Sequence, residues 1–514
     1  MKRFSVNEWI IMGLLVVLKL TAHLLTYNMY EPHRDEFLYM AMKDHLAWGY
    51  LSVPPFIGFA GKTASILLGN TIFAYKLMPA LAGVLTLMIV FLMVKELGGK
   101  TWAIFIGGAS YLLSPTFLHI NALFQPVSFD VLFWTLLIYL TMILARRSEP
   151  RYLIWLGVVS GIAILNKYST GFLLVSLLVS LLLSPHRKIL LHRNTWIAIL
   201  AALLIVAPNL FWQIRHGLPV VHHLNELYET QLVNVSILNF SIDQLVMHIP
   251  ALLVWVAGLL MLLFSPGLKQ FRFIGAAYGI LFILLACTHG KSYYMAGFYP
   301  VLFSAGGFVI GTQWKGRLRA VKYFIVLILF AMGLFGLPLG LPYLEQDKME
   351  KYGQKIGPSV NFAPFRWEDG KVHKLPQDWA DMTGWEELAG MVYRTYQELP
   401  PESRKKCFIW AENYGQAGAI RFYTLMKGLP EPVSFSDNFL LWAPDSLGEL
   451  EYLIYVNDET EEISTHFRSV TSCGTITNPL AREYGLGVYL CAQPYRNFSE
   501  IYARKAAERK SQFR

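Results

Sequence analysis

Eleven runs of mostly apolar residues follow one another before residue 345, and they constrain the fold more than any other feature. A membrane crossing needs ~20 mostly apolar residues, or somewhat fewer where a helix is short. Only 15% of the 514 residues are charged and the mean hydropathy is +0.41, so charge is too scarce to cover a water-facing surface. The sequence therefore predicts an α-helical polytopic membrane protein with about eleven transmembrane helices, at roughly 9–29, 77–95, 101–118, 127–145, 152–166, 170–184, 194–213, 248–264, 271–288, 297–312 and 321–341.

Basic residues gather at alternate ends of these runs, and such residues are retained on the cytoplasmic side of a crossing. The basic ends carry Lys2, Arg3, Lys95, Lys100, Arg146, Arg147, Arg151, Arg187, Lys188, Arg193, Lys269, Arg272, Lys315, Arg317, Arg319 and Lys322. This pattern predicts a bacterial cytoplasmic (inner) membrane protein with a cytoplasmic N-terminus and a periplasmic or extracellular C-terminal region. The same asymmetry accounts for the formal net charge of +9, so no nucleic-acid partner is expected.

The composition changes after Leu344, where short apolar stretches alternate with polar ones. The stretches "CFIW", "YLIYV" and "GVYLC" predict strands, and "YGQAGAIRFYTLM" predicts a helix. We therefore expect a transmembrane domain over 1–344, with a catalytic first outer loop at 30–76, and a soluble extracytoplasmic α/β domain over 345–514. No nucleotide-binding motif occurs in this second domain. Two states are open for Cys473 and Cys491. They either form a disulfide, which an oxidising compartment permits, or remain two unpaired thiols, with Cys491 in a buried strand.

The first outer loop begins "YEPHRDEFLYMAMKDHLAWGYLSVPPF" at residues 30–56. At 3.6 residues per turn, one side of a helix starting near Pro32 is polar, with Asp35, Glu36, Tyr39 and Lys43, and the other side carries Phe37, Leu38, Ala41 and Trp48. This pattern is typical of a helix in the membrane interface, with its apolar face toward the acyl chains and its carboxylates toward a watery cavity.

Both carboxylates lie in the first turn of this predicted helix, where the helix dipole favours ionisation. An ionised carboxylate facing a cavity can accept a proton or hold a hydroxyl. The alternative is that Asp35 and Glu36 only cap a surface helix and that Arg34 neutralises one of them.

Six motifs, in order, resemble the GT-C glycosyltransferases of the protein O-mannosyltransferase and aminoarabinose transferase superfamily (glycosyltransferase family 39-like). They are "DEFLY", "HLAWGYLSVPPF", "FQPVSFDVLFW", "GIAILNKYSTG", "GKSYYMAGFYP" and "NYGQAGAIRFY". The resemblance implies a GT-C fold and a polyprenyl phosphate sugar donor, with Asp35 as catalytic base, Glu36 in support and Asp130 as the second acidic position. The further loop motifs of either branch are not found, so neither the mannosyl nor the aminoarabinosyl substrate is implied.

A sugar on a lipid phosphate already has a stabilised leaving group, so the protein must orient the acceptor, take its proton and neutralise the phosphate. Lys or Arg alone can neutralise a monophosphate, without a metal ion. The candidates for this role on the outer side of the membrane are Arg34, Lys167 and Lys291. The predicted substrate-binding set is His33, Arg34, Tyr39, Asp130, Lys167, Lys291, Tyr293 and Tyr294. Lys167 and Lys291 have an alternative role as interface anchors, and Asp130 as a helix N-cap.

The leading hypothesis is an inverting, mannosyltransferase-like enzyme that transfers a hexose or a pentose. Its acceptor would be a lipid, a glycan or a protein, and the enzyme itself would be surrounded by membrane lipids. No cofactor is required. A divalent metal, for which His33, His119, His222 and His223 would be the ligands, is possible but not favoured because no helical metal-ligand spacing links them. An ion-coupled transporter or lipid flippase using Asp35, Glu36 and Asp130 is the alternative, although the chain lacks the repeated halves of such proteins. A non-catalytic scaffold is a third possibility.

Overall fold

The computed structural model describes residues 4–356 and 365–513, and within this part the chain divides into two compact units. The membrane unit comprises 1–27, 73–211 and 224–343, and the α/β unit comprises 28–72, 212–223 and 344–514. The α/β unit thus includes most of the predicted first outer loop. The predicted domain limits, 1–344 and 345–514, stay predictions. Lys2, Arg3 and Arg514, which belong to the predicted topology, lie outside the described residues.

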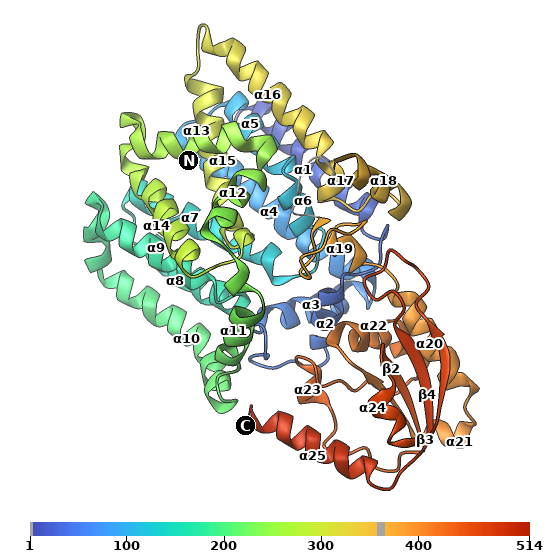
Figure 1. Cartoon of the computed structure of the whole chain (residues 1–514). Helices are drawn as coiled ribbons and strands as arrows, with labels where there is room; N and C mark the ends of the chain where they lie inside the picture. The colour runs from blue at the N-terminus through green and yellow to red at the C-terminus, as the bar shows by residue number, and fades with distance from the viewer. Residues whose placement is uncertain (1–3, 357–364, 514) are drawn as a thin grey trace. The chain divides into compact units, whose positions relative to one another are not determined.

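The membrane unit is helical, as predicted (Figure 1). Within the described residues, seven helical segments are long and apolar enough to cross a membrane: α1 (Val6–Thr26), α4 (Ile72–Leu97), α7 (Pro126–Arg147), α10 (Arg193–Arg215), η4 with α14 (Pro266–Cys287), η5 to η6 (Ser292–Gln313) and α16 (Leu318–Phe335). Two bent pairs raise the number to nine if each is one span: α9 (Thr170–Leu182) with η1 (Pro185–Leu191), and α12 (Ile237–Val246) with Ile249–Phe264.

The two remaining predicted crossings coincide with shorter apolar helices, α5 (Thr101–Leu112) and α8 (Arg151–Asn166). The run at 101–118 is interrupted because α5 ends at Leu112 and Pro115 begins a separate helix, α6 (Pro115–Ile120). Proline fits the first turn of a helix but cannot continue one. By length and composition the count in the described part is therefore seven to nine rather than eleven.

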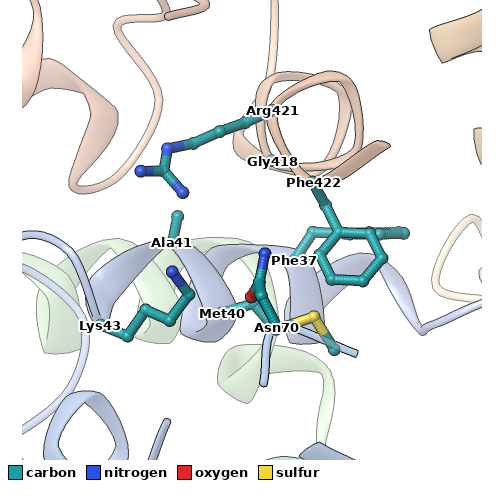
Figure 2. A pocket seen from close by; sticks show the side chains of 8 residues that line it. All are labelled: Phe37, Met40, Ala41, Lys43, Asn70, Gly418, Arg421 and Phe422. Atoms are coloured by element: carbon teal, nitrogen blue, oxygen red, sulfur yellow. The ribbon is translucent and has the colours of Figure 1, made fainter. Parts of the chain in front are cut away.

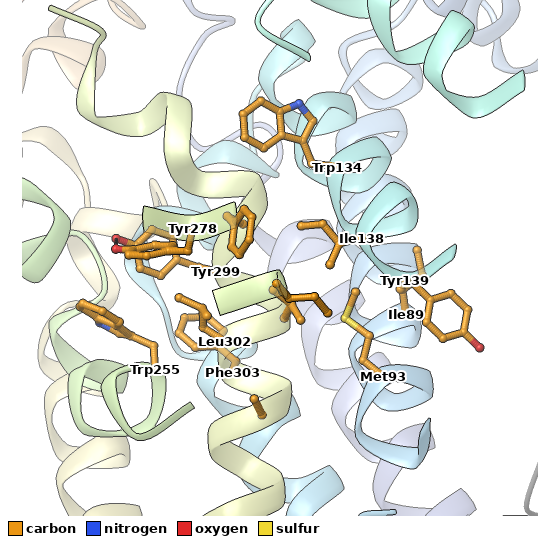
Figure 3. Packing of buried hydrophobic residues seen from close by; sticks show 14 of the residues in the cluster. Ile89, Met93, Trp134, Ile138, Tyr139, Trp255, Tyr278, Tyr299, Leu302 and Phe303 are labelled. Atoms are coloured by element: carbon orange, nitrogen blue, oxygen red, sulfur yellow. Dashed lines mark hydrogen bonds between the residues drawn. The ribbon is translucent and has the colours of Figure 1, made fainter. Parts of the chain in front are cut away.

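Aromatic and aliphatic side chains from several helices fill the interior of the membrane unit (Figure 3). Trp255 and Tyr299 meet edge to face, with ring centroids 5.4 Å apart. Their helices, α13 (Leu252–Phe264) and α15 (Tyr299–Phe308), approach closely because Gly258 and Gly306 lie at the contact. A Cβ atom on Gly306 would lie 1.9 Å from the carbonyl oxygen of Val254, so only glycine permits this backbone approach.

The α/β unit contains a four-stranded sheet in the order β1-β2-β4-β3. β1 (Cys407–Ala411), β2 (Tyr452–Asn457) and β4 (Gly487–Pro494) match the three predicted strands, and α22 (Tyr414–Thr424) matches the predicted helix. β1 and β2 are parallel and are joined through α22, whereas β4 runs antiparallel to both β2 and β3 (Phe467–Thr475). The predicted α/β character is confirmed. Cys491 is buried in β4, Cys473 is exposed in β3, and both are free thiols.

Residues 28–72 add two helices to this unit, α2 (Arg34–Met42) and α3 (Phe56–Leu68). α20 (Trp385–Glu398) and α22 pack on the sheet. Shorter segments complete the described chain: η2 (Leu232–Asn234), η3 (Ile249–Ala251), α11 (Pro219–Thr230), α17 (Leu337–Gly340), α18 (Gln346–Ile356), α19 (Gln377–Ala380), α21 (Pro401–Arg404), η8 (Leu425–Lys427), α23 (Phe439–Trp442), α24 (Glu461–Ser464) and α25 (Phe498–Ser511).

Candidate active site

The start of α2 is closed by its own side chains. His33 is the N-cap, and its Nδ1 accepts a hydrogen bond of 3.1 Å from the backbone N–H of Asp35. In return, the Glu36 carboxylate accepts a 2.7 Å bond from the backbone N–H of His33. This reciprocal arrangement is a capping box, with histidine in place of the usual serine or threonine. Glu36 is fully buried, so it stabilises the helix start and does not share the partly exposed position of Asp35.

Asp35 is the carboxylate of α2 that remains accessible, with 34% of its side chain exposed. Its Oδ1 accepts a 2.7 Å hydrogen bond from the hydroxyl of Tyr414, at the first position of α22. Its Oδ2 lies 4.0 Å from Nδ1 of His33. Tyr39, one turn along α2, is within electrostatic range of Asp35, and burial together with that carboxylate raises the pKa of its hydroxyl well above the ordinary value. Asp35 is thus one fixed, accessible carboxylate between protonated phenols.

Arg34 brings a positive charge to the same place. Its guanidinium carbon lies 4.8 Å from the centre of the Tyr414 ring, a cation–π contact. Within the described residues it forms no ion pair with a carboxylate, and its buried Nε has no hydrogen-bond partner. The predicted alternative, that Arg34 neutralises Asp35 or Glu36, is therefore not what the structure contains. A half-buried guanidinium without a carboxylate partner is suited to bind an anion.

His33 lies among three carboxylates. Its Nε2 is 3.7 Å from Asp378 and 3.7 Å from Asp381, and Asp35 is on its other side. Burial opposes a charge on the ring, but these carboxylates outweigh it and raise the pKa of His33 to about 9. Nδ1 can either cap α2 or bind the second proton, because a protonated ring nitrogen cannot accept a hydrogen bond.

His33, Asp378 and Asp381 are also the one group of described residues whose ligand atoms are close enough to hold a metal ion, all within 4.8 Å of one another. Arg482 already donates to both carboxylate oxygens of Asp381, at 3.3 and 3.1 Å. The guanidinium of Arg482 thus already brings a positive charge to this cluster. We therefore interpret the cluster as a partly buried ion-pair network.

The motif "NYGQAGAIRFY" covers the N-cap of α22 and all of that helix except its last residue, and it fits against α2 (Figure 2). Asn413 caps the helix, and Tyr414 reaches Asp35. Gly418 allows the close approach, since a Cβ atom there would lie 2.8–3.0 Å from Cβ, C and O of Phe37. Arg421 forms a 2.8 Å ion pair with Asp44, which also binds Lys43 at 2.6 Å.

A small cavity between α2 and α22 is lined by Phe37, Met40, Ala41, Lys43, Asn70, Gly418, Arg421 and Phe422 (Figure 2). Both cations in its wall, Lys43 and Arg421, are paired with carboxylates, so the cavity does not have the unpaired charge that an anion site requires.

The prediction that the apolar face of α2 lies against the acyl chains of the membrane is wrong. Phe37 is fully buried and packs against Trp385, Phe422 and Tyr423, with ring centroids 5.8–5.9 Å apart. This face is covered by protein, not by lipid, because the C-terminal region supplies its own aromatic side chains. The helix also ends at Met42, so Trp48 and Leu46 are not part of it.

Sequence reasoning missed two acids of this unit. The Glu31 carboxylate accepts hydrogen bonds from the backbone N–H groups of Gly384, Trp385 and Glu386, and so caps α20 from a distant part of the chain. Asp437, in a left-handed conformation with φ 48°, lies within electrostatic range of both Asp35 and His223. Burial raises the pKa of the Asp437 carboxyl. No local pattern signals either role, since both depend on contacts between distant segments.

The other predicted residues gather in the membrane unit. Asp130, the fifth residue of α7, is buried and accepts 3.3 Å hydrogen bonds from the hydroxyls of Ser169 and Thr170. The Lys167 ammonium is 4.8 and 4.6 Å from the ring centres of Tyr293 and Tyr294, and both Asp130 and Lys291 are within its electrostatic range. Asp130, Lys167, Lys291, Tyr293 and Tyr294 therefore form one cluster, although they come from three separate motifs.

Among the described residues, the four candidate histidines do not form a group of the kind that could hold a metal ion. His119 belongs to α6 of the membrane unit, whereas His33, His222 and His223 belong to the α/β unit. The His222 ring contacts Phe513 at 5.8 Å.

Comparisons with known proteins agree with this architecture. Residues 52–212 match the family model described as dolichyl-phosphate-mannose-protein mannosyltransferase. A lipid A galacturonosyltransferase (RgtD) of Rhizobium johnstonii is 26% identical over 223 residues, 42% of this chain; the chain spans about half of the length of that relative, 46%.

Solved structures share the fold over nearly the whole chain. ArnT from Cupriavidus metallidurans, solved with bound undecaprenyl phosphate, superposes with a TM-score of 0.65 at 14% identity, covering 95% of this chain and 98% of that one. The oligosaccharyltransferase of Archaeoglobus fulgidus, solved with zinc and sulfate, gives 0.51 at 12% identity, covering 88% and 68%. The chain is a helical polytopic membrane protein with a fold like that of ArnT, and its residues 52–212 match the model of the dolichyl-phosphate-mannose-protein mannosyltransferase family.

Proposed function

We propose that this protein is an inverting membrane glycosyltransferase that moves a single sugar from a polyprenyl phosphate donor to an acceptor hydroxyl outside the cytoplasm. One observation carries the proposal: an accessible carboxylate, Asp35, is held by a 2.7 Å hydrogen bond beside Arg34, a guanidinium without a carboxylate partner. A base and an anion-binding cation are the two groups that such a transfer needs.

In the proposed reaction, the acceptor oxygen gives its proton to Asp35 and forms a bond to the anomeric carbon of the sugar. The bond from that carbon to the phosphate oxygen breaks at the same time, and its electron pair leaves with the polyprenyl phosphate. Arg34 stabilises the negative charge of the leaving group. A single displacement of this kind inverts the anomeric configuration.

The membrane-unit cluster suits the donor lipid. Lys167 and Lys291 bring two cations together beside Tyr293 and Tyr294, and Asp130 compensates part of that charge. We propose that this cluster contributes to binding of the donor phosphosugar. The ArnT structure named above was solved with a polyprenyl phosphate, undecaprenyl phosphate, which supports this class of donor.

The acceptor is proposed to be a glycolipid of the lipid A class. The support is the name of the relative, a lipid A galacturonosyltransferase, which matches 42% of this chain. The alternation of basic residues along the sequence supports an orientation with the N-terminus in the cytoplasm and the α/β unit outside.

The test is to replace Asp35 by Asn in cells that have no other copy of the gene and to compare polyprenyl-linked sugars and lipid A glycoforms by mass spectrometry. The amide keeps the shape of the side chain but cannot take the proton. One polyprenyl phosphate sugar should accumulate while one glycolipid species disappears. Unchanged levels of both would reject the proposal. Loss of a protein or polysaccharide glycoform, with lipid A intact, would retain the enzyme class and reject the acceptor.

A further inference from the structure

We propose that Tyr414 is a positioning residue for both charged groups of the candidate site: its hydroxyl orients the carboxylate of Asp35, and its ring holds the guanidinium of Arg34. The inference rests on the proposed function, because it assigns Asp35 as the base and Arg34 as the phosphate-binding cation. It adds that the α/β unit is part of the catalytic machinery through α22.

The position of Tyr414 is itself well fixed. Asn413 accepts hydrogen bonds of 2.9 and 3.1 Å from the backbone N–H groups of Gly415 and Gln416, and the Gln416 side chain accepts one from the N–H of Asn413 in return. Gln416 also donates a 3.0 Å bond to Glu483. Tyr414 therefore starts a helix whose first turn is closed by a capping box.

The Tyr414 hydroxyl can act only as a donor toward Asp35. Burial and the neighbouring carboxylate of Asp35 raise the pKa of the Tyr414 hydroxyl far above its ordinary value, so the phenol keeps its proton. The 2.7 Å bond engages Oδ1 of Asp35. Oδ2 is 4.0 Å from His33, beyond hydrogen-bond distance, and is therefore the oxygen left to take the acceptor proton.

The ring of Tyr414 has a second, separate contact. The Arg34 guanidinium lies 4.8 Å from the ring centre, and a cation–π contact does not need the hydroxyl. A Cβ atom on Gly415, next to Tyr414, would lie 2.5 Å from Cγ of Arg34, so glycine leaves room for this side chain. The two contacts use different parts of one residue and can be removed one at a time.

The charged and titratable groups around Asp35 come from three segments: His33, Arg34 and Tyr39 from α2 and its cap, Tyr414 from α22, and Asp437 from the segment before α23. Only Tyr414 makes a direct side-chain hydrogen bond to Asp35 among the described residues. Without that donor the carboxylate loses the hydrogen bond that fixes its orientation, so turnover should fall.

The experiment compares purified full-length variants, with the polyprenyl-linked sugar isolated from Asp35→Asn cells as donor and undecaprenyl phosphate as affinity probe. Tyr414→Phe removes only the hydroxyl. Turnover should fall by about 10- to 100-fold, as for loss of one hydrogen bond to a charged group. Affinity for undecaprenyl phosphate should not change, because the ring that contacts Arg34 remains.

Tyr414→Leu removes the ring as well, so affinity for undecaprenyl phosphate should weaken by about 3- to 30-fold, the range of a cation–π contact. Tyr423→Phe is the matched control, since it removes a hydroxyl from the same helix that does not bond to Asp35. It should retain wild-type turnover and affinity for undecaprenyl phosphate. In the Asp35→Asn background, Tyr414→Phe should cause no further loss, because the base on which it acts is gone.

Wild-type turnover in Tyr414→Phe, with an inactive Asp35→Asn enzyme, would overturn this inference and leave the proposed function intact. An equal loss from Tyr414→Phe with and without Asp35 would also overturn it, since the hydroxyl would then act elsewhere. Full turnover in Asp35→Asn would instead reject the proposed base, and the inference with it.

Discussion

At the scale of single residues, His33 links the charge of the site to the stability of the α/β unit. Its pKa is raised from the ordinary 6.5 to about 9, so the folded protein binds a proton more tightly than the unfolded chain. The stabilisation this proton provides is complete below pH ~6.5 and is lost as the pH rises through about 9.

His33→Asn tests this dependence, because asparagine caps helices well but does not titrate. Thermal unfolding of the purified protein should show a loss of stability between pH 6.5 and 9 in the wild type that is absent in the variant. The same slope in both proteins would show that another group titrates in this range.

Residue roles were predictable only where they follow from local sequence. The helical wheel and the dipole argument identified Asp35 and Glu36 as first-turn acids, and the structure confirms that position. The sequence pattern could not distinguish the exposed Asp35 from the buried Glu36, because burial of Glu36 depends on how the rest of the unit covers α2. The Tyr414 and Asp437 neighbours of Asp35 lie about 400 residues away along the chain, beyond any pattern of spacing.

At the scale of secondary-structure elements, the contact between α2 and α22 depends on Gly418. Alanine at this position would place its Cβ 2.9 Å from the backbone carbon of Phe37, so one helix must move. Gly418→Ala should destabilise the protein by ~1–3 kcal/mol, the usual cost of overpacking. Unfolding in detergent, followed by circular dichroism, measures the change.

Gly390→Ala is the matched control, since Gly390 lies inside α20 of the same unit and a Cβ there meets nothing closer than 3.6 Å. Because alanine is the better helix former, this variant should be unchanged or more stable by up to ~1 kcal/mol. Equal stability of the two alanine variants would contradict the close packing of α2 on α22.

Elements with strong internal patterns were predicted, and elements defined by their surroundings were not. The apolar runs and the strands β1, β2 and β4 are confirmed, because continuous hydrophobic stretches are typical of buried helices and strands. β3 was missed because its sequence, "FRSVTSCGT", is mostly polar and exposed at the edge of the sheet. The prediction that α2 lies in the membrane interface was wrong, because an amphipathic pattern shows that one face is covered but does not show whether lipid or protein covers it.

At the scale of the whole molecule, the orientation in the membrane is a prediction from the basic residues alone. Alkaline phosphatase, which folds only outside the cytoplasm, should be active when fused to the C-terminus. A green fluorescent protein fused there should be dark if the fusion is exported unfolded. The reverse pattern would place the α/β unit in the cytoplasm and would remove the extracytoplasmic site.

The central claim is that Asp35 is the base of a transfer from a polyprenyl phosphate sugar. The most direct measurement is the transfer rate of purified Asp35→Asn together with its affinity for undecaprenyl phosphate, compared with the wild type. Turnover should fall by ~10²–10⁴, the usual effect of losing a general base, while affinity is retained. Near-normal turnover, or loss of affinity with normal chemistry, would contradict the account.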